Sequence, residues 1–202
     1  EIPYYGLMKG ELDGMDVVVS RTGYTGEVGY ELYLRAAAKH GVLVLEAEGR
    51  PLGSLAAADV SDGLLHELWR IVVTMHDTGI AHGGLDGDRI FVAPNGSGRI
   101  TGFQAATASA SPQAILADRA RLLVTTAVIV DDDRAVGAAL ERLGADGLSE
   151  MLPFIQPAAL TRSTQRTLKG AGVDLDALRE HAAGAAGVEP PKLEPLRRVT
   201  VG

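Results

Sequence analysis

The stretch that decides the fold is His82-Gly-Gly-Leu-Asp-Gly-Asp-Arg-Ile-Phe-Val92, a loop of glycine and aspartate that runs into three apolar residues. Glycine and aspartate favour turns, and the triplet 90–92 is typical of a short strand. Asn-Gly at 95–96 is a strong hairpin signal, and Arg99-Ile100 supplies the expected partner strand. Upstream, apolar residues recur at helical spacing and predict a helix over 61–78. The loop therefore lies between a helix and a hairpin.

The flanking segments differ in their patterns. Residues 1–35 have β patterning, with an apolar strand at Met15–Val19, a turn at 9–14 and period-2 alternation over 28–35. A buried strand is expected at 41–46. After residue 112 the chain looks wholly helical, with helices expected at 113–130, 132–143, 146–153, 157–169 and 174–187. The fold class is α+β, a short N-terminal β-hairpin region followed by a mostly helical lobe.

Composition and charge exclude several classes of function. Twenty-six acidic and 19 basic residues give a net charge of −7, which argues against a nucleic-acid binder. The absence of cysteine excludes a disulfide scaffold, a thiolate zinc site and cysteine catalysis. The five histidines do not form a metal pattern, so no metal site is expected. The longest apolar run, residues 122–130, is far shorter than the roughly 20 residues that span a bilayer. We therefore expect no transmembrane segment.

Three features of the segment around the loop occur in an order known from another fold. The loop at 82–92 resembles the protein-kinase sequence H-R-D-L-x-x-x-N and the strand after it. Ile100-Thr-Gly-Phe103 stands where kinases carry D-F-G, and Asp118 resembles the buried aspartate that braces the catalytic loop. Residues 41–202 thus resemble a kinase-like C-terminal lobe, as found in actinobacterial membrane proteins related to lysylphosphatidylglycerol synthetase and flippases. The resemblance implies structural roles for His82 and Asp118.

The same resemblance shows the catalytic positions replaced. Gly84 stands in place of the base, Arg89 in place of a metal ligand, and Thr101 or Gly102 in place of the main magnesium ligand. Phosphoryl transfer depends on positioning and on metal-held charge. The resemblance therefore implies a pseudokinase-like lobe without phosphotransfer.

Two carboxylates in the loop keep an alternative open. Asp86 and Asp88 are the weak catalytic candidates, as a displaced base or as magnesium ligands of a degenerate phosphotransferase. The simpler interpretation is that Asp86-Gly87-Asp88 forms an exposed turn.

A second motif, at residues 20–33, resembles a different family. Ser20-Arg-Thr-Gly-Tyr-Thr-Gly-Glu-Val-Gly-Tyr-Glu-Leu-Tyr33 resembles the folate-binding region of aminomethyltransferases, the T-protein of the glycine cleavage system. The resemblance implies that Glu31 holds the pterin end of tetrahydrofolate, because a carboxylate can accept two hydrogen bonds from an aminopterin edge. This likeness ends between Tyr33 and His40. The alternative is a β-hairpin retained for packing.

These interpretations give three parts: an aminomethyltransferase-like β segment at 1–40, a kinase-like lobe at 41–187 and an extended proline-rich tail at 188–202. The sequence leaves open whether the two unrelated pieces, joined near residues 36–41, are a genuine fusion.

The main hypothesis is a catalytically inactive interaction or regulatory module that binds a protein partner or a fused membrane domain. It predicts a cytoplasmic location, or one at the inner face of the plasma membrane, and no cofactor. The alternatives are a fragment of a folate-dependent aminomethyltransferase, which would bind tetrahydrofolate, and a degenerate phosphotransferase, which would bind Mg-ATP.

Overall fold

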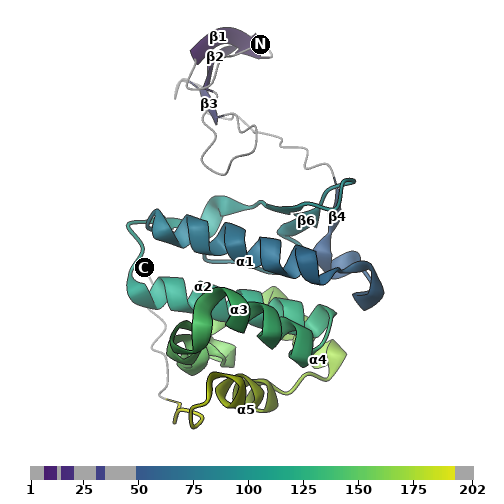
Figure 1. Ribbon diagram of the computed structural model, residues 1–202. Helices are drawn as coiled ribbons and strands as arrows, with labels where there is room; N and C mark the ends of the chain where they lie inside the picture. The colour runs from purple at the N-terminus through teal and green to yellow at the C-terminus, as the bar shows by residue number, and fades with distance from the viewer. Residues whose placement is uncertain (1–6, 13–14, 21–30, 35–48, 194–202) are drawn as a thin grey trace. The chain divides into compact units, whose positions relative to one another are not determined.

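The computed structural model describes residues 7–12, 15–20, 31–34 and 49–193. The chain divides into two compact units, Glu1–Glu46 and Ala47–Gly202, which Figure 1 colours from purple to yellow along the chain. The strand expected at 41–46 and the end of the expected tail, 194–202, lie outside the described residues.

The described part of the first unit is a three-stranded antiparallel sheet in the order β1-β2-β3. Its strands are β1 (Leu7–Leu12), β2 (Met15–Ser20) and β3 (Glu31–Leu34). β2 confirms the strand predicted at Met15–Val19. β1 corrects the sequence interpretation, which assigned residues 9–14 to a turn. Cross-strand pairing of β1 with β2 outweighs the turn preference of its Lys9-Gly10 pair.

The second unit is mostly helical. Its α-helices are α1 (Asp62–Asp77), α2 (Pro112–Ile129), α3 (Asp132–Met151), α4 (Arg162–Ala171) and α5 (Leu175–Ala186). Its strands are β4 (Arg50–Pro51), β5 (Ile80–Ala81), β6 (Ile90–Val92), β7 (Gly98–Ile100) and β8 (Thr107–Ala108). Short 3-10 turns occupy Leu52–Ser54, Ala57–Asp59, Phe103–Ala105, Leu152–Phe154 and Pro157–Ala159. The described residues therefore form a mixed helix and sheet structure.

The helices begin and end where capping chemistry dictates. Ser61, Ser111 and Asp174 each accept a backbone N–H at a helix start with a side-chain oxygen. Gly144 has φ 70° and kinks α3, which explains why the sequence predicted two helices there. The helix predicted at 157–169 begins later, at Arg162, because Thr161 caps α4.

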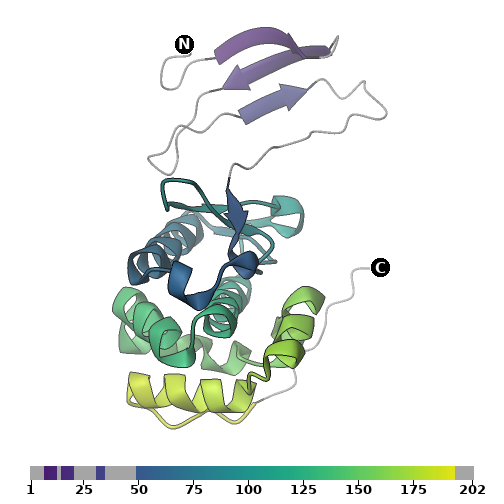
Figure 2. The ribbon, with the colours of Figure 1, turned by 90° about the vertical axis from the view of Figure 1, so that its right-hand side faces the viewer.

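The core of the second unit lies between α1, α2 and α3, and α5 packs against the outer side of α3 (Figure 2). Because its apolar residues recur at helical spacing, α1 buries one continuous face. The largest fully buried side chains in the described residues come from these helices, from strand β6 and from the turns and loops around them: Trp69, Leu52, Leu65, Leu68, Leu85, Ile90, Leu122, Leu123, Leu148, Met151, Leu152 and Ile155.

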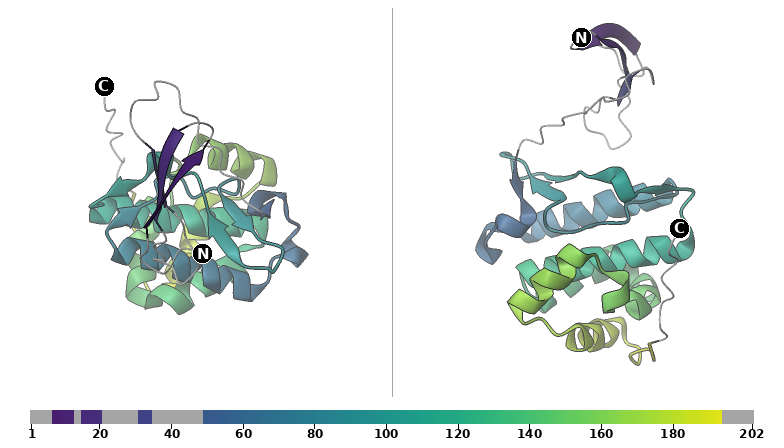
Figure 3. Two further views of the ribbon diagram at one scale, coloured as in Figure 1. Left: turned by 90° about the horizontal axis from the view of Figure 1, so that it is seen from above. Right: turned by 180° about the vertical axis from the view of Figure 1, so that it is seen from behind.

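The predicted hairpin is present. β6 pairs with β7 antiparallel, and β4 adds to the other edge of β6. Figure 3 shows this sheet along the side of α1 that faces away from α2. At Gly98 in β7, an added Cβ would lie 2.7 Å from Cδ2 of Leu68, so a larger residue there would force the buried Leu68 side chain to shift. The hairpin thereby fixes where the loop 82–89 ends.

None of the described helices combines the length and the apolarity that a bilayer crossing needs.

Replacing Leu68 with alanine should lower the free energy of unfolding by about 2–5 kcal/mol, because the side chain is fully buried and leaves a cavity. The matched control is Val188→Ala, whose side chain is 42% exposed, and it should change the value by less than about 0.5 kcal/mol. Urea unfolding of both variants measures the difference. Equal effects would contradict the assignment of Leu68 to the core.

Candidate functional site

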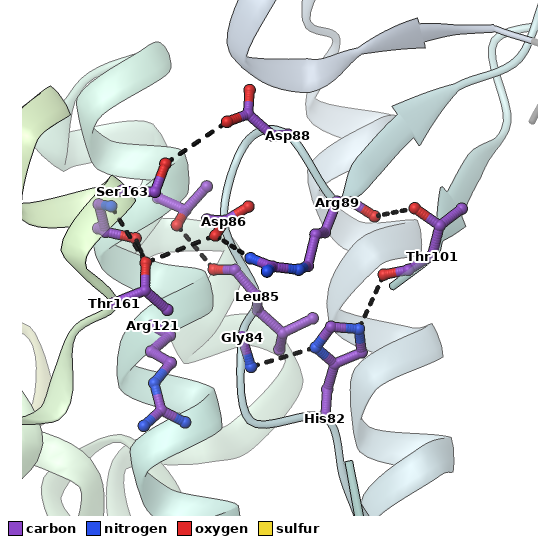
Figure 4. Close-up of polar contacts among 12 residues, drawn as sticks. His82, Gly84, Leu85, Asp86, Asp88, Arg89, Thr101, Arg121, Thr161 and Ser163 are labelled. Atoms are coloured by element: carbon purple, nitrogen blue, oxygen red, sulfur yellow. Dashed lines mark hydrogen bonds and ion pairs between the residues drawn. The ribbon is translucent and has the colours of Figure 1, made fainter. Parts of the chain in front are cut away.

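The loop between β5 and β6 is the candidate site, and its chain is mostly buried. His82, Leu85 and Asp86 are each at most 2% exposed, whereas Asp88 is exposed. Figure 4 shows the loop between α2 and α4 on one side and the β-hairpin on the other. The sequence predicted that Asp86-Gly87-Asp88 forms an exposed turn. Asp88 is exposed as predicted, but Asp86 is buried because the loop turns its side chain toward Arg89 and Thr161.

Asp118 of α2 holds the start of the loop. Its Oδ1 accepts the Gly83 N–H at 2.9 Å and a guanidinium N–H of Arg121 at 2.8 Å. Its Oδ2 accepts the His82 N–H, and Nε2 of His76 lies 3.6 Å away. The carboxylate is fully buried, so these donors replace the water it lost on folding.

These partners set the charge of Asp118. Burial alone would raise its pKa, but the imidazole of His76, the positive charge of Arg121 and the His82 N–H outweigh burial and hold the pKa below its ordinary value of 3.8. The charged form of Asp118 is thus the one that the folded state stabilises.

His82 links the loop to the hairpin. Its Nδ1 accepts the Gly84 N–H at 3.2 Å, and its Nε2 donates to the Thr101 carbonyl oxygen at 2.9 Å. Burial is the main cause that lowers the pKa of His82. A neutral imidazole with one donor and one acceptor fits both contacts. Phe103 packs edge-on against its ring, with centroids 4.8 Å apart.

Arg89 fills the space beside two glycines, Gly84 and Gly102. Its Nη1 donates to Oδ2 of Asp86. A Cβ added at Gly84 would lie 3.5 Å from Nη1 of Arg89, and one added at Gly102 would lie 2.9 Å from its Cδ. Thr101, the other alternative at the metal-ligand position, donates its N–H and its hydroxyl to the Arg89 carbonyl oxygen. The Arg89 side chain therefore lies beside Gly84 and Gly102, and its carbonyl oxygen is held by Thr101.

The described residues contain no group of three or more histidine, cysteine, aspartate or glutamate side chains placed to hold a metal ion. Asp86 is engaged by Arg89, and Asp88 is 3.4 Å from the hydroxyl of Ser163. The structure therefore brings His82, Gly84, Asp86, Arg89 and Thr101 together around one guanidinium.

Several contacts of the loop were missed by the sequence reasoning. The Thr125 hydroxyl donates to the Leu85 carbonyl oxygen at 2.9 Å, and Thr161 lies 3.4 Å from Oδ2 of Asp86. A buried threonine in the middle of an apolar helix face was the available signal for Thr125. Thr161 carries no local signal, because its contact is with a residue 75 positions away.

Glu31, the predicted folate contact, belongs to the first unit. It begins β3, and its backbone pairs with that of Ser20 in β2. The motif 20–33 thus joins two neighbouring strands of one sheet. Residues 21–30 between them lie outside the described residues.

Comparisons with known proteins concern this N-terminal part. Residues 1–58 match the family described as the GCVT N-terminal domain. An aminomethyltransferase of Cutibacterium acnes is 52% identical over 54 residues, which are 26% of this chain and 15% of that protein. The Thermotoga maritima aminomethyltransferase is 46% identical over 66 residues, 30% of this chain and 18% of the relative. The chain thus spans less than one fifth of the length of these relatives.

The comparisons support the aminomethyltransferase likeness and extend it. From the motif alone this likeness was expected to end between Tyr33 and His40, whereas the family match continues to residue 58. Neither the family match nor these relatives support the kinase-like resemblance of residues 41–202. They favour the alternative interpretation, a piece of an aminomethyltransferase, over the main one.

Replacing Asp118 with asparagine should destabilise the second unit by about 3–5 kcal/mol, the usual effect of breaking a buried ion pair. Because the folded pKa of Asp118 is lowered, its contribution is present above pH 3.8 and is lost as the pH falls through the folded pKa. The wild type should therefore lose more stability than Asp118→Asn on acidification below about pH 4. Chemical unfolding at neutral and acidic pH measures both effects.

The matched control for this prediction is Asp133→Asn, since the Asp133 side chain is 89% exposed and its ion-pair partner among the described residues is the half-exposed His181. Equal destabilisation by the two variants would show that the buried contacts of Asp118 with His82, Gly83 and Arg121 contribute no more than one surface charge.

Proposed function

We propose that residues 1–58 are a folate-contacting segment of the aminomethyltransferase kind, with Glu31 as the carboxylate that receives the pterin. The observation that carries this proposal is the match of the whole segment to the GCVT N-terminal domain, which includes the motif 20–33. The names of the relatives supply the reaction class, aminomethyl transfer.

The chemistry of recognition follows from the carboxylate. An ionised glutamate is an acceptor with two oxygens, and an aminopterin presents adjacent N–H donors along one edge. Hydrogen bonds to a charged group contribute about 1.5–3 kcal/mol each. Glu31 lies at the start of β3, next to Ser20, so the sheet places it at the edge where the motif crosses from one strand to the next. The remaining walls of a folate pocket, and the transfer step itself, come from outside this segment.

In a titration of the full chain with tetrahydrofolate, Glu31→Gln should weaken binding at least about tenfold, because one charge-assisted pair is lost. The control is Glu11→Gln, a glutamate of the same sheet on β1 that lies opposite Asp16. It should leave the affinity unchanged. Isothermal calorimetry measures the three affinities. Equal affinities for wild type and Glu31→Gln, or no binding by the intact chain, would overturn the proposal.

A second candidate concerns the described part of the second unit, residues 49–193. We propose that it is a non-catalytic binding module with a kinase-like loop, which acts on a protein partner or a fused membrane domain. The observation that favours it is the placement of Arg89 beside Gly84 and Gly102. A guanidinium there repels a divalent cation, and position 84 offers no carboxylate to accept a hydroxyl proton.

Thermal unfolding of the full chain should show no upward shift on addition of saturating Mg-ATP. A ligand at 100 times its dissociation constant would add roughly 2.7 kcal/mol to stability, which is several degrees for a domain of this size. A clear upward shift would overturn this candidate. If Asp86→Asn or Asp88→Asn then abolished that shift, the degenerate phosphotransferase would take its place.

A further inference from the structure

A cavity of about 480 Å³ opens beside the loop, between α2, α4 and the segment 53–55. Its size lies within the range of small-ligand sites. The polar side chains that line it are two carboxylates and four hydroxyls: Asp86, Asp88, Thr125, Ser163, Thr164 and Thr167. Its apolar wall consists of Leu55, Val128 and Ile129. No lysine, arginine or histidine lines it.

Asp86 lies at the buried end of this cavity. It is 2% exposed, and its Oδ1 has no hydrogen-bond partner among the described residues. Its Oδ2 faces Arg89 and Thr161 (Figure 4). A buried carboxylate oxygen without a donor costs free energy, which a ligand N–H would recover. At this end of the cavity the described residues therefore leave one carboxylate oxygen without a donor.

Asp88 places a second negative charge at the exposed end of the cavity. Only the hydroxyl of Ser163, 3.4 Å from Oδ2, approaches its carboxylate among the contacts of the described residues. With Asp86 neutralised by Arg89, the net charge of the lining remains negative. An anionic ligand is repelled here and a cation is attracted.

The shape of the lining restricts the cation further. A bare metal ion would make no apolar contact with the wall formed by Leu55, Val128 and Ile129. Long basic side chains bury an aliphatic stem against apolar surface and keep a charged head on polar groups. An ammonium or guanidinium on a stem of several methylenes matches both halves of the cavity.

We propose that this cavity binds an alkyl cation, a primary ammonium or guanidinium carried on an aliphatic stem. Two sources share this chemistry, a lysine or arginine side chain of a partner polypeptide and a free aliphatic amine. The inference rests on the second candidate function, in which residues 49–193 form a binding module. It names the chemistry that the module recognises.

The close contact of the loop with the segment before α1 shapes the cavity floor. The Gly53 N–H donates to the Gly87 carbonyl oxygen at 2.9 Å, and a Cβ at Gly87 would lie 2.9 Å from Cα of Gly53. Substitutions at these glycines would disturb the fold. Asp86 is unsuitable as well, because its removal would leave Arg89 without its ion pair.

Two other positions test the cavity without this difficulty. Asp88→Asn removes the exposed charge at the cavity mouth. Gly170→Leu adds bulk from α4, where an added Cβ meets nothing within 4 Å, and leucine favours the helix more than glycine does. The matched controls are Asp146→Asn, an exposed carboxylate of α3, and Gly137→Leu, an open helical glycine of α3; neither residue lines the cavity.

The experiment is calorimetric titration of the full chain with n-pentylammonium, agmatine, an acetylated and amidated Ala-Arg-Ala peptide, and 1-pentanol. The ammonium and guanidinium probes should bind, and more weakly at high salt, whereas pentanol should not. Asp88→Asn should weaken binding up to about fivefold, as expected for an exposed charge pair. Gly170→Leu should abolish binding, and both controls should match the wild type. Preferred binding of the peptide would assign a polypeptide partner, and preferred binding of agmatine a free amine.

Three outcomes would overturn the inference: no binding of any cation, equal binding of pentanol and pentylammonium, or unchanged affinity in both Asp88→Asn and Gly170→Leu. The Mg-ATP measurement separates this failure from failure of the module. If neither cations nor Mg-ATP bind, only the alkyl-cation inference fails, whereas a Mg-ATP shift removes the non-catalytic module itself.

Discussion

The loop at 82–89 depends on one buried carboxylate, that of Asp118. It accepts the N–H groups of His82 and Gly83 and pairs with Arg121, all from inside the protein. Consecutive backbone N–H groups in a sharp bend have no helix or sheet partner of their own, so without this acceptor they would be buried and unpaired. The position of Asp118 in the first half of α2 therefore fixes where the loop can start.

The rest of the loop follows from that start. His82 reaches the hairpin through the Thr101 carbonyl oxygen, and Thr125 holds the Leu85 carbonyl oxygen from the next turns of α2. Arg89 closes the loop on Asp86. Among the described residues, the loop side chains that remain available to a ligand are Asp88, which is exposed, and Asp86, whose Oδ1 has no hydrogen-bond partner.

Local signals in the sequence predicted most of the second unit. The helical period of α1, its Ser61 cap and the Asn-Gly turn of the β6–β7 hairpin are set by neighbours in the chain, and the structure agrees with them. The contact of the Thr161 hydroxyl with Asp86 was not predictable in this way. It depends on a partner 75 residues away, and sequence periodicity carries no information on such pairs. The burial of Asp86 was not predictable either, because the residue types of a turn do not determine which of its side chains is buried.

The N-terminal likeness was predicted from one motif, but its extent was not. From the sequence, the junction between the two parts was expected near residues 36–41. In the structure the first compact unit ends at Glu46, and the family match continues to residue 58. Within the overlap, Arg50–Pro51 pairs with β6, and Leu52 is fully buried in the core of the second unit. Strand pairing uses the backbone N–H and C=O groups, and every residue except proline has both. A core position requires mainly an apolar side chain of suitable volume. A segment can therefore keep the sequence of one family while its backbone completes the sheet of another unit. For this reason, similarity and packing place the boundary of the first part at different residues.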